Sequence, residues 1–384
     1  MKGKKSSREF IEPSFIKPNP TSPKEPAMPL NRLLRTLGLS ALVTLGADAL
    51  EVDPKASIRD ASTSVLGINH IGLSVRDLDK TLAFYQQATG FELVKRERIS
   101  GNRAADKLYG RDNIAYEIAV LKAPNMLLEL TAFKHNAGTT LSTMPVQGPG
   151  MTHTCFQSPA AESGYEKFVK AGARLLSRGD RPVDIGGYGV TYAYAYDPEG
   201  NMIEVEQLEE KALAQSGYDS TWVVQNHPMW MSQVGLATHD IERLMAFYQK
   251  VLGFAPYRAG DYDANPKLDQ ITAIDQVALR GGWFRMNDTS KVMEFWQYKK
   301  PATPALKGRR DITDLGYSFS IEVGNIQEEY RRLKKLGVAF TGEPVYLDDF
   351  WQVYAQDPDG NVFALRQAVD PQSVYSVNHF DRRR

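Results

Sequence analysis

Residues 69–93 are NHIGLSVRDLDKTLAFYQQATGFEL, and residues 232–256 are SQVGLATHDIERLMAFYQKVLGFAP. The two stretches align without gaps and share Gly-Leu, an Asp, Ala-Phe-Tyr-Gln and Gly-Phe. A second pair follows, because AYDPEGNMIEVEQ at 195–207 matches AQDPDGNVFALRQ at 355–367. Self-similarity at a fixed spacing indicates a duplicated domain.

Each repeat also divides into two smaller units. A strand pattern at 70–75 precedes an amphipathic helix at 77–88, and strand-like stretches follow up to MLLELTAF at 126–133. A strand at 152–157 then begins a second unit of strand, helix and strands. The second half repeats this pattern at 233–298 and 317–367. The sequence therefore predicts four modules with the same order of elements.

Bulk composition excludes several classes of protein. The 46 Lys and Arg balance the 46 Asp and Glu, so no overall basic field would attract nucleic acid. The single cysteine, Cys155, allows no internal disulfide. A hydrophobic content of 42% suits a globular chain with a substantial core.

The first 65 residues are expected to form a disordered tail outside the fold. They include an apolar run at 37–47 that is too short to span a bilayer. Arg32 and Arg35 precede the run and small residues follow it, so 28–49 fits a secretory signal peptide, which would place the protein outside the cytoplasm. The same residues also fit an amphipathic helix packed on the body of a cytoplasmic protein.

These motifs in this order resemble the vicinal-oxygen-chelate (VOC) superfamily, which includes glyoxalase I, methylmalonyl-CoA epimerase, fosfomycin-resistance proteins and extradiol dioxygenases. The resemblance covers the segments from HIGLSVRDL to the end of the second repeat. It implies an α+β fold in which four βαβββ modules pair into two cupped mixed-sheet domains. We expect domains at 66–208 and 230–370, a linker at 209–229 and a C-terminal tail at 371–384.

In this family the metal ligands come from the first and last strands of each module. The matching positions in the first half are His70, Glu129, His153 and Glu204. Strand alternation supports three of them, because His70, Glu129 and Glu204 each lie opposite an apolar face. Two imidazoles and two carboxylates suit one divalent ion, namely Zn, Ni, Co, Mn or Fe(II).

The second half is predicted to have lost its metal site. Gln233, Ser318 and Ala364 stand where the first half has His70, His153 and Glu204, and Glu294 alone keeps its counterpart's carboxylate. We therefore expect this half to be structural or to cover the substrate.

Three tyrosines and the cysteine are candidates for lining the cavity. Tyr192, Tyr194 and Tyr196 alternate with alanines, so they share one face of a strand and could line a substrate pocket or pack at a domain contact. Cys155 has the strand parity of His153, but the sequence assigns it no catalytic role.

The resemblance leaves three functions open. The first is a glyoxalase-like lyase or isomerase that acts on a small molecule with vicinal oxygens through a metal-stabilised enediolate, with Glu204 or Glu129 as the base. The second is an extradiol ring-cleaving Fe(II) dioxygenase that uses His70, His153 and Glu204. The third is a protein that binds a small molecule without turnover. A monomer or a homodimer is expected, without a membrane span.

Overall fold

The computed structural model describes residues 63–139, 143–187, 189–216, 227–286, 291–305 and 311–380. The N-terminal residues 1–62 lie outside the described residues, so the signal peptide at 28–49 stays a prediction. Among the described ranges no helix is both long enough and apolar enough to cross a bilayer.

The four predicted modules are present. The first contains β1 (Val65–Ser74), α2 (Leu78–Thr89), β2 (Glu92–Ile99), α3 (Arg103–Tyr109), β3 (Tyr116–Lys122) and β4 (Leu127–Phe133). The second contains β5 (Gly150–Pro159), α4 (Gly164–Ala171), β6 (Arg174–Leu175), β7 (Val183–Asp184), β8 (Val190–Tyr196) and β9 (Met202–Leu208).

The second half repeats this order. The third module contains β10 (Trp230–Ala237), α7 (Ile241–Leu252), β11 (Arg258–Tyr262), α8 (Pro266–Thr272), β12 (Ala278–Arg285) and β13 (Val292–Lys300). The fourth contains β14 (Gly316–Val323), α9 (Ile326–Lys335), β15 (Ala339–Phe340), β16 (Val345–Leu347), β17 (Phe350–Gln356) and β18 (Val362–Ala368). The predicted α+β fold of two curled mixed sheets is confirmed.

The modules do not pair in the expected order. One sheet, here called sheet A, has the strand order β11-β12-β13-β10-β5-β9-β8-β6 and joins the second module to the third. The other, sheet B, has the order β15-β17-β18-β14-β1-β4-β3-β2 and joins the first module to the fourth. This corrects the expectation that 66–208 and 230–370 each close a domain, because both sheets contain strands from both halves.

Two antiparallel strand pairs make these joins. In sheet A, Gly235 of β10 lies opposite His153 of β5. In sheet B, Gly72 of β1 lies opposite Ser318 of β14. Since Gly72 and Gly235 are equivalent in the repeat, the two joins have the same register.

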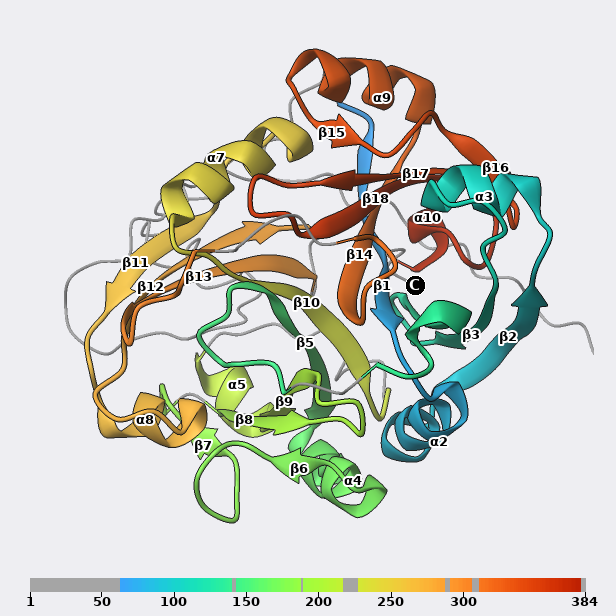
Figure 1. The fold of residues 1–384 in the computed structure, drawn as a ribbon. Coiled ribbons are helices and arrows are strands. Elements are labelled where there is room, and N and C mark those ends of the chain that lie inside the picture. The colour runs from blue at the N-terminus through green and yellow to red at the C-terminus, as the bar shows by residue number, and fades with distance from the viewer. Residues whose placement is uncertain are drawn as a thin grey trace, which may run out of the picture.

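A shared apolar core lies between the sheets and four amphipathic helices. Figure 1 shows the sheets side by side, with α7 and α9 on one side and α2 and α4 on the other. Phe84 of α2 packs against Phe168 of α4 with their ring centroids 5.9 Å apart. On α9, Arg332 donates to the carbonyls of Lys250 and Val251 at the end of α7, at 2.8 and 2.7 Å. Each helix pair therefore joins consecutive modules even though their strands belong to different sheets.

The repeated Asp-Pro-acid-Gly-Asn turns fasten strands to helices. Tyr85 of α2 donates to Asp197 at 3.0 Å, and Tyr248 of α7 makes the equivalent bond to Asp357 at 3.0 Å. Glu199 accepts from the backbone N–H of Asp77, the N-cap of α2, at 2.9 Å. These hydrogen bonds to the helices give the turn a structural role in each half, which explains why it occurs twice in the sequence.

Two segments expected to lie outside the domains are partly folded. The predicted linker begins with helix α5 (Glu210–Ser216), whose Leu213 is buried. The predicted C-terminal tail contains α10 (Val377–Phe380), whose Phe380 is buried. Ser376 donates to Glu322 of β14 at 2.5 Å, so this segment is anchored to sheet B.

Candidate metal centre

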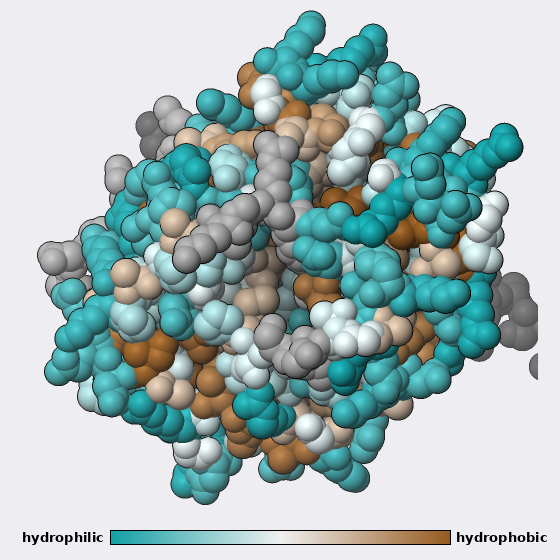
Figure 2. Space-filling model, in the orientation of Figure 1, coloured by the Kyte–Doolittle hydropathy of each residue, from teal (hydrophilic) through white to brown (hydrophobic). Residues whose placement is uncertain are grey.

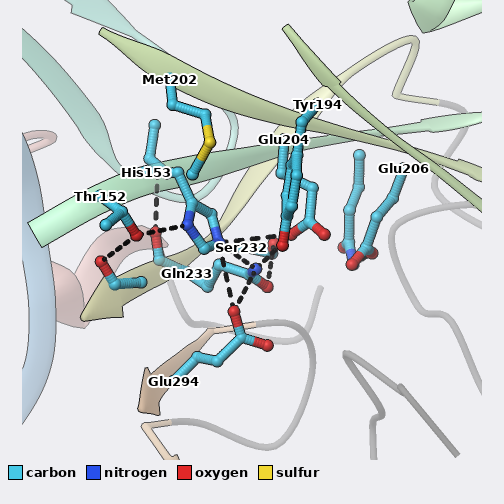
Figure 3. A network of polar contacts seen from close by, with 12 residues as sticks. Thr152, His153, Tyr194, Met202, Glu204, Glu206, Ser232, Gln233 and Glu294 are labelled. Carbon is cyan, nitrogen blue, oxygen red and sulfur yellow. Dashed lines mark hydrogen bonds and ion pairs between the residues drawn. The ribbon is translucent and has the colours of Figure 1, made fainter. Parts of the chain in front are cut away.

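The four central strands of sheet A bring four ligand-type side chains together. Gln233 comes from β10, Glu294 from β13, His153 from β5 and Glu204 from β9. Figure 3 shows the four side chains converging on one point. All four are buried, with 0 to 3% of their surface exposed.

Short contacts connect the four side chains. His153 Nε2 lies 3.2 Å from Glu294 Oε2 and 3.6 Å from Glu204 Oε2. The Gln233 amide donates to Glu294 Oε2 at 3.1 Å and also to Glu204 Oε2, and it lies 3.2 Å from His153 Nε2. One position is therefore within reach of an imidazole, two carboxylates and a carboxamide.

The imidazole of His153 is oriented from behind by Thr152. Thr152 Oγ1 lies 3.0 Å from His153 Nδ1 and 3.4 Å from the carbonyl oxygen of Gly235. Because that hydroxyl donates to the carbonyl, it accepts the proton of Nδ1, and Nε2 faces the carboxylates. Metal-binding histidines are commonly oriented in this way, by a hydrogen bond at the ring nitrogen that does not bind the metal.

The two buried carboxylates of this cluster are stabilised by a positive charge close to them. Burial lowers the pKa of His153, but hydrogen bonds to Glu204 and Glu294 outweigh burial and raise the pKa to about 9. Burial also raises the pKa of Glu204. Two buried carboxylates that share one imidazole repel each other unless a proton or a cation lies between them.

A divalent ion fits this set of donors. One atom each from His153, Glu204 and Glu294 lies within 4.8 Å of the others. The terminal amide of Gln233 can rotate to present its oxygen in place of its nitrogen. One nitrogen and three oxygens are ligands that Zn, Ni, Co, Mn and Fe(II) accept.

The structure does not bring the four predicted ligands together. His153 and Glu204 belong to the cluster in sheet A, whereas His70 and Glu129 lie in sheet B, with His70 Nε2 3.4 Å from Glu129 Oε2. The structure thereby separates the predicted set His70, Glu129, His153 and Glu204, and the side chains that meet in sheet A are Gln233, Glu294, His153 and Glu204. The physical reason is the crossed pairing of the modules, which places β5 beside β10 and β1 beside β14.

The equivalences between the two halves hold in space. His70 and Glu129 take the positions in sheet B that Gln233 and Glu294 take in sheet A. Ser318 and Ala364 occupy the two remaining positions, and neither can replace an imidazole or a carboxylate. The four positions of the degenerate site that we expected in the second half are therefore divided, with Gln233 and Glu294 in sheet A and Ser318 and Ala364 in sheet B.

The three tyrosines lie on the same side of sheet A as the cluster. Tyr192, Tyr194 and Tyr196 are buried in the apolar group inside the curve of the sheet, while Ala193 and Ala195 join the core behind it. The ring of Tyr194 lies 5.4 Å from that of His153. Tyr196 donates to the carbonyl oxygen of Met144 at 2.8 Å. Of the three, Tyr194 is the one that touches the imidazole.

Cys155 also faces the cluster, as its strand parity predicts. Its sulfur lies within 4.8 Å of carboxylate oxygens of Glu204 and Glu206, and burial raises the pKa of the thiol. Glu206 accepts from Gln157 at 2.5 Å, and burial raises the pKa of this second carboxyl. These groups form a polar layer behind Glu204.

Three residues of this cluster were not predicted to belong to it, namely Gln233, Glu294 and Trp283. The positions of Gln233 and Glu294 in the repeat, equivalent to His70 and Glu129, were the signal that could have found them. Trp283 donates from Nε1 to Glu294 Oε1 at 2.8 Å and had no sequence signal, because its strand partner is set by the register of β12 on β13. It holds Glu294 in place.

Comparison with known proteins agrees with the fold. The model of the Glyoxalase/Bleomycin resistance protein/Dioxygenase superfamily matches residues 67–205 and 230–365. Lactoylglutathione lyase of Schizosaccharomyces pombe is 26% identical over 300 residues, which cover 74% of this chain and 90% of the yeast protein. An ethylmalonyl-CoA/methylmalonyl-CoA epimerase of Cereibacter sphaeroides is 23% identical over 143 residues, covering 37% of this chain and 97% of the epimerase.

Solved structures show the same architecture. The crystal structure of glyoxalase I from Zea mays superposes with a TM-score of 0.52 at 21% identity, covering 78% of this chain and 92% of the maize chain. This likeness shows the fold, and the family model matches most of both halves. The chain belongs to the Glyoxalase/Bleomycin resistance protein/Dioxygenase superfamily.

Proposed function

We propose that the protein is a metal-dependent lyase or isomerase that acts on a small molecule with vicinal oxygens, and that its active site is the cluster in sheet A. The observation that carries this proposal is the convergence of Gln233, Glu294, His153 and Glu204 on one buried point. A bound divalent ion would polarise a substrate oxygen and so acidify the neighbouring C–H.

Relatives in both reaction classes support this proposal. The yeast protein is a lactoylglutathione lyase, and the bacterial one is an epimerase of ethylmalonyl-CoA and methylmalonyl-CoA. Each of the compounds in these names is a thioester with a proton-bearing carbon beside the carbonyl. We therefore place the substrate among thioesters or related carbonyl compounds whose reaction moves a proton at that carbon.

The hydrogen bonds distinguish the two carboxylates. Glu294 is held through both oxygens, by Trp283 at Oε1 and by Gln233 and His153 at Oε2. Glu204 bonds to Gln233 through Oε2, and its burial raises its pKa, which suits a group that accepts a proton. We assign the base to Glu204 and the role of a fixed ligand to Glu294. Glu129, the other predicted base, lies in sheet B and takes no part.

A matched pair of substitutions tests the location of the metal. Glu294→Gln and Glu129→Gln make the same change at equivalent positions of the two sheets. After removal of metal and anaerobic reloading with each of the five ions, elemental analysis should give about one ion per chain in the wild type and in Glu129→Gln. Affinity should fall at least tenfold in Glu294→Gln. The reverse pattern would contradict this location. Absence of metal from all three proteins would contradict the proposed enzyme and favour a protein that binds a small molecule without turnover.

The chemistry is tested with the same preparations. The loaded protein should exchange the proton beside the carbonyl of S-lactoylglutathione or methylmalonyl-CoA for deuterium in D₂O, as followed by NMR. Glu204→Gln should lose this exchange by at least a hundredfold. Retention of iron together with oxygen consumption on catechols, without proton exchange, would favour the dioxygenase instead.

A further inference from the structure

A cavity of about 320 Å³ opens in sheet B, away from the cluster in sheet A. The first module contributes β2, β3, β4 and α3 to its lining, and the fourth contributes β16, β17 and β18. Its volume is in the range of small-molecule sites in proteins. Its walls include five aromatic side chains, namely Tyr109, Tyr116, Phe350, Tyr354 and Tyr375. We call this space the sheet B cavity.

A guanidinium group stands at its floor, beside the remains of the lost metal site. Arg366 Nη1 donates to Glu129 Oε1 at 2.6 Å and lies 2.7 Å from His70 Nδ1. Burial, with the charge of Arg366 added, lowers the pKa of His70 to about 4 despite the opposing effect of Glu129, so the imidazole is neutral. A fixed positive charge against both remaining ligands excludes a metal ion from this position.

The guanidinium retains unused hydrogen-bonding capacity. Its hydrogen bonds to the residues that the structure describes run through Nη1, including one to Asn69 Oδ1 at 3.2 Å. Its Nε is buried and has no partner in the part of the chain that the structure describes. The side chain lines the cavity and is 5% exposed, with the ring of Phe350 3.7 Å from its central carbon. A buried donor without a partner favours a ligand that brings an acceptor.

The charges on the lining select the type of ligand. Arg366 and Glu129 neutralise each other, so the net charge of the lining depends on its other charged side chains. They are one lysine, Lys95, and the three carboxylates of Glu97, Asp348 and Asp349. Lys95 pairs with Asp348 at 2.8 Å and with Glu97 at 3.3 Å. The excess of carboxylates disfavours anions, and aromatic walls favour flat rings and cations.

We propose that the sheet B cavity is a second ligand site that works without metal and takes a flat, uncharged or cationic aromatic molecule with an acceptor for Arg366. In sheet B, the absence of two of the four ligand-type side chains has thus changed the site rather than removed it. On the face drawn in Figure 2, hydrophobic atoms are visible in hollows between hydrophilic ones near the position of α3, one of the elements around the cavity.

Three probes that share one benzene ring separate the effect of the ligand's charge from that of its ring and acceptor. Benzamide is neutral, 4-(aminomethyl)benzamide is cationic and 4-carbamoylbenzoate is anionic, and all three carry the same carbonyl acceptor. Ligand-observed NMR titration of the full chain should show saturable binding of the first two and at least tenfold weaker binding of the third. Treatment with a chelator should leave these affinities unchanged. Absence of binding, preference for the anion or loss of binding with the chelator would overturn the proposal.

Two substitutions locate the binding. Val94→Trp fills the cavity from a half-buried position on β2 and leaves Arg366 in the chain. It should abolish binding while the metal content of sheet A stays at the wild-type value. Arg366→Gln should weaken binding at least tenfold, and if this variant does not fold, Val94→Trp decides alone. Gln233→Ala, which alters the other sheet, is the matched control and should bind the probes normally. Unchanged binding in Val94→Trp would place the probes elsewhere and contradict the proposal.

Discussion

At the scale of single residues, the two sheets make opposite use of equivalent side chains. In sheet A the amide of Gln233 donates to two carboxylates, and the imidazole of His153 faces the same two groups. In sheet B, His70 Nδ1 faces the guanidinium of Arg366, so its proton is on Nε2, toward Glu129. The same strand position therefore belongs to the proposed cation site in one sheet and to a neutral hydrogen-bonded pair in the other.

The neutral state of His70 should be visible in the pH dependence of stability. As the pH falls from 6.5, the unfolded chain protonates this imidazole, whereas the folded chain does so only near its lowered pKa of about 4. The free energy of unfolding should therefore fall in this window, by up to about 3 kcal/mol from this group. His70→Gln, which copies Gln233, should lose that part of the slope in urea titrations at pH 7, 5.5 and 4. Equal slopes in the two proteins would contradict a lowered pKa for His70 in the folded chain.

Residue patterns predicted part of the site. Strand alternation and the family motif placed His153 and Glu204 on one face, where the structure has them 3.6 Å apart, because a period of two fixes which face of a strand a side chain occupies. The same argument gave the faces of His70 and Glu129 but assigned them to the wrong partners. Gln233 was discounted because its counterpart is an imidazole, although an amide oxygen is also a metal ligand.

At the scale of elements, the two joining strands cross at glycines that are tightly packed. A Cβ atom at Gly235 would overlap the imidazole of His153, whereas at Gly72 it would meet the hydroxyl of Ser318. The imidazole is fixed by Thr152 and the ligand cluster, but a serine hydroxyl can rotate to another rotamer.

This difference predicts unequal effects for the same substitution. Gly235→Ala should displace His153, weaken metal binding at least tenfold and cost about 1–3 kcal/mol of stability. Gly72→Ala should leave metal binding unchanged and lower the stability less. Metal titration and thermal unfolding of the two variants provide the comparison. Equal loss of metal from both would mean that the glycine opposite His153 has no special role.

At the scale of the whole molecule, the crossed pairing could not be deduced from the repeats. The elements of all four modules are evident from periodicity, but the edges of β5, β10, β1 and β14 offer the same backbone groups. Which edges meet depends on contacts between residues far apart in the chain, such as Ser320 with His70. Local patterns therefore predicted the modules and the faces of their strands, but not which modules pair in each sheet.

Crossed pairing predicts that neither half is sufficient. A fragment of residues 63–216 lacks Gln233 and Glu294, so it should bind a divalent ion at least a hundredfold more weakly than the full chain. Co-expression with a fragment of residues 227–384 should restore one site for each pair of fragments. Copurification and elemental analysis measure both results. Stoichiometric metal in the first fragment alone would support the sequential pairing that the structure replaces.

The distance along the chain between β1 and β14 affects how the protein is made. In sheet B, the contact of His70 with Ser320 joins residues that are 250 positions apart. In sheet A, β5 and β10 are joined by contacts such as that of Gln233 with His153, which are only 80 positions apart. At about 5–20 residues per second, His70 leaves the ribosome roughly 12 to 50 s before Ser320 does. Sheet A can close first on the nascent chain. The exposed edge of β1 is then the part that a chaperone would have to protect until synthesis ends.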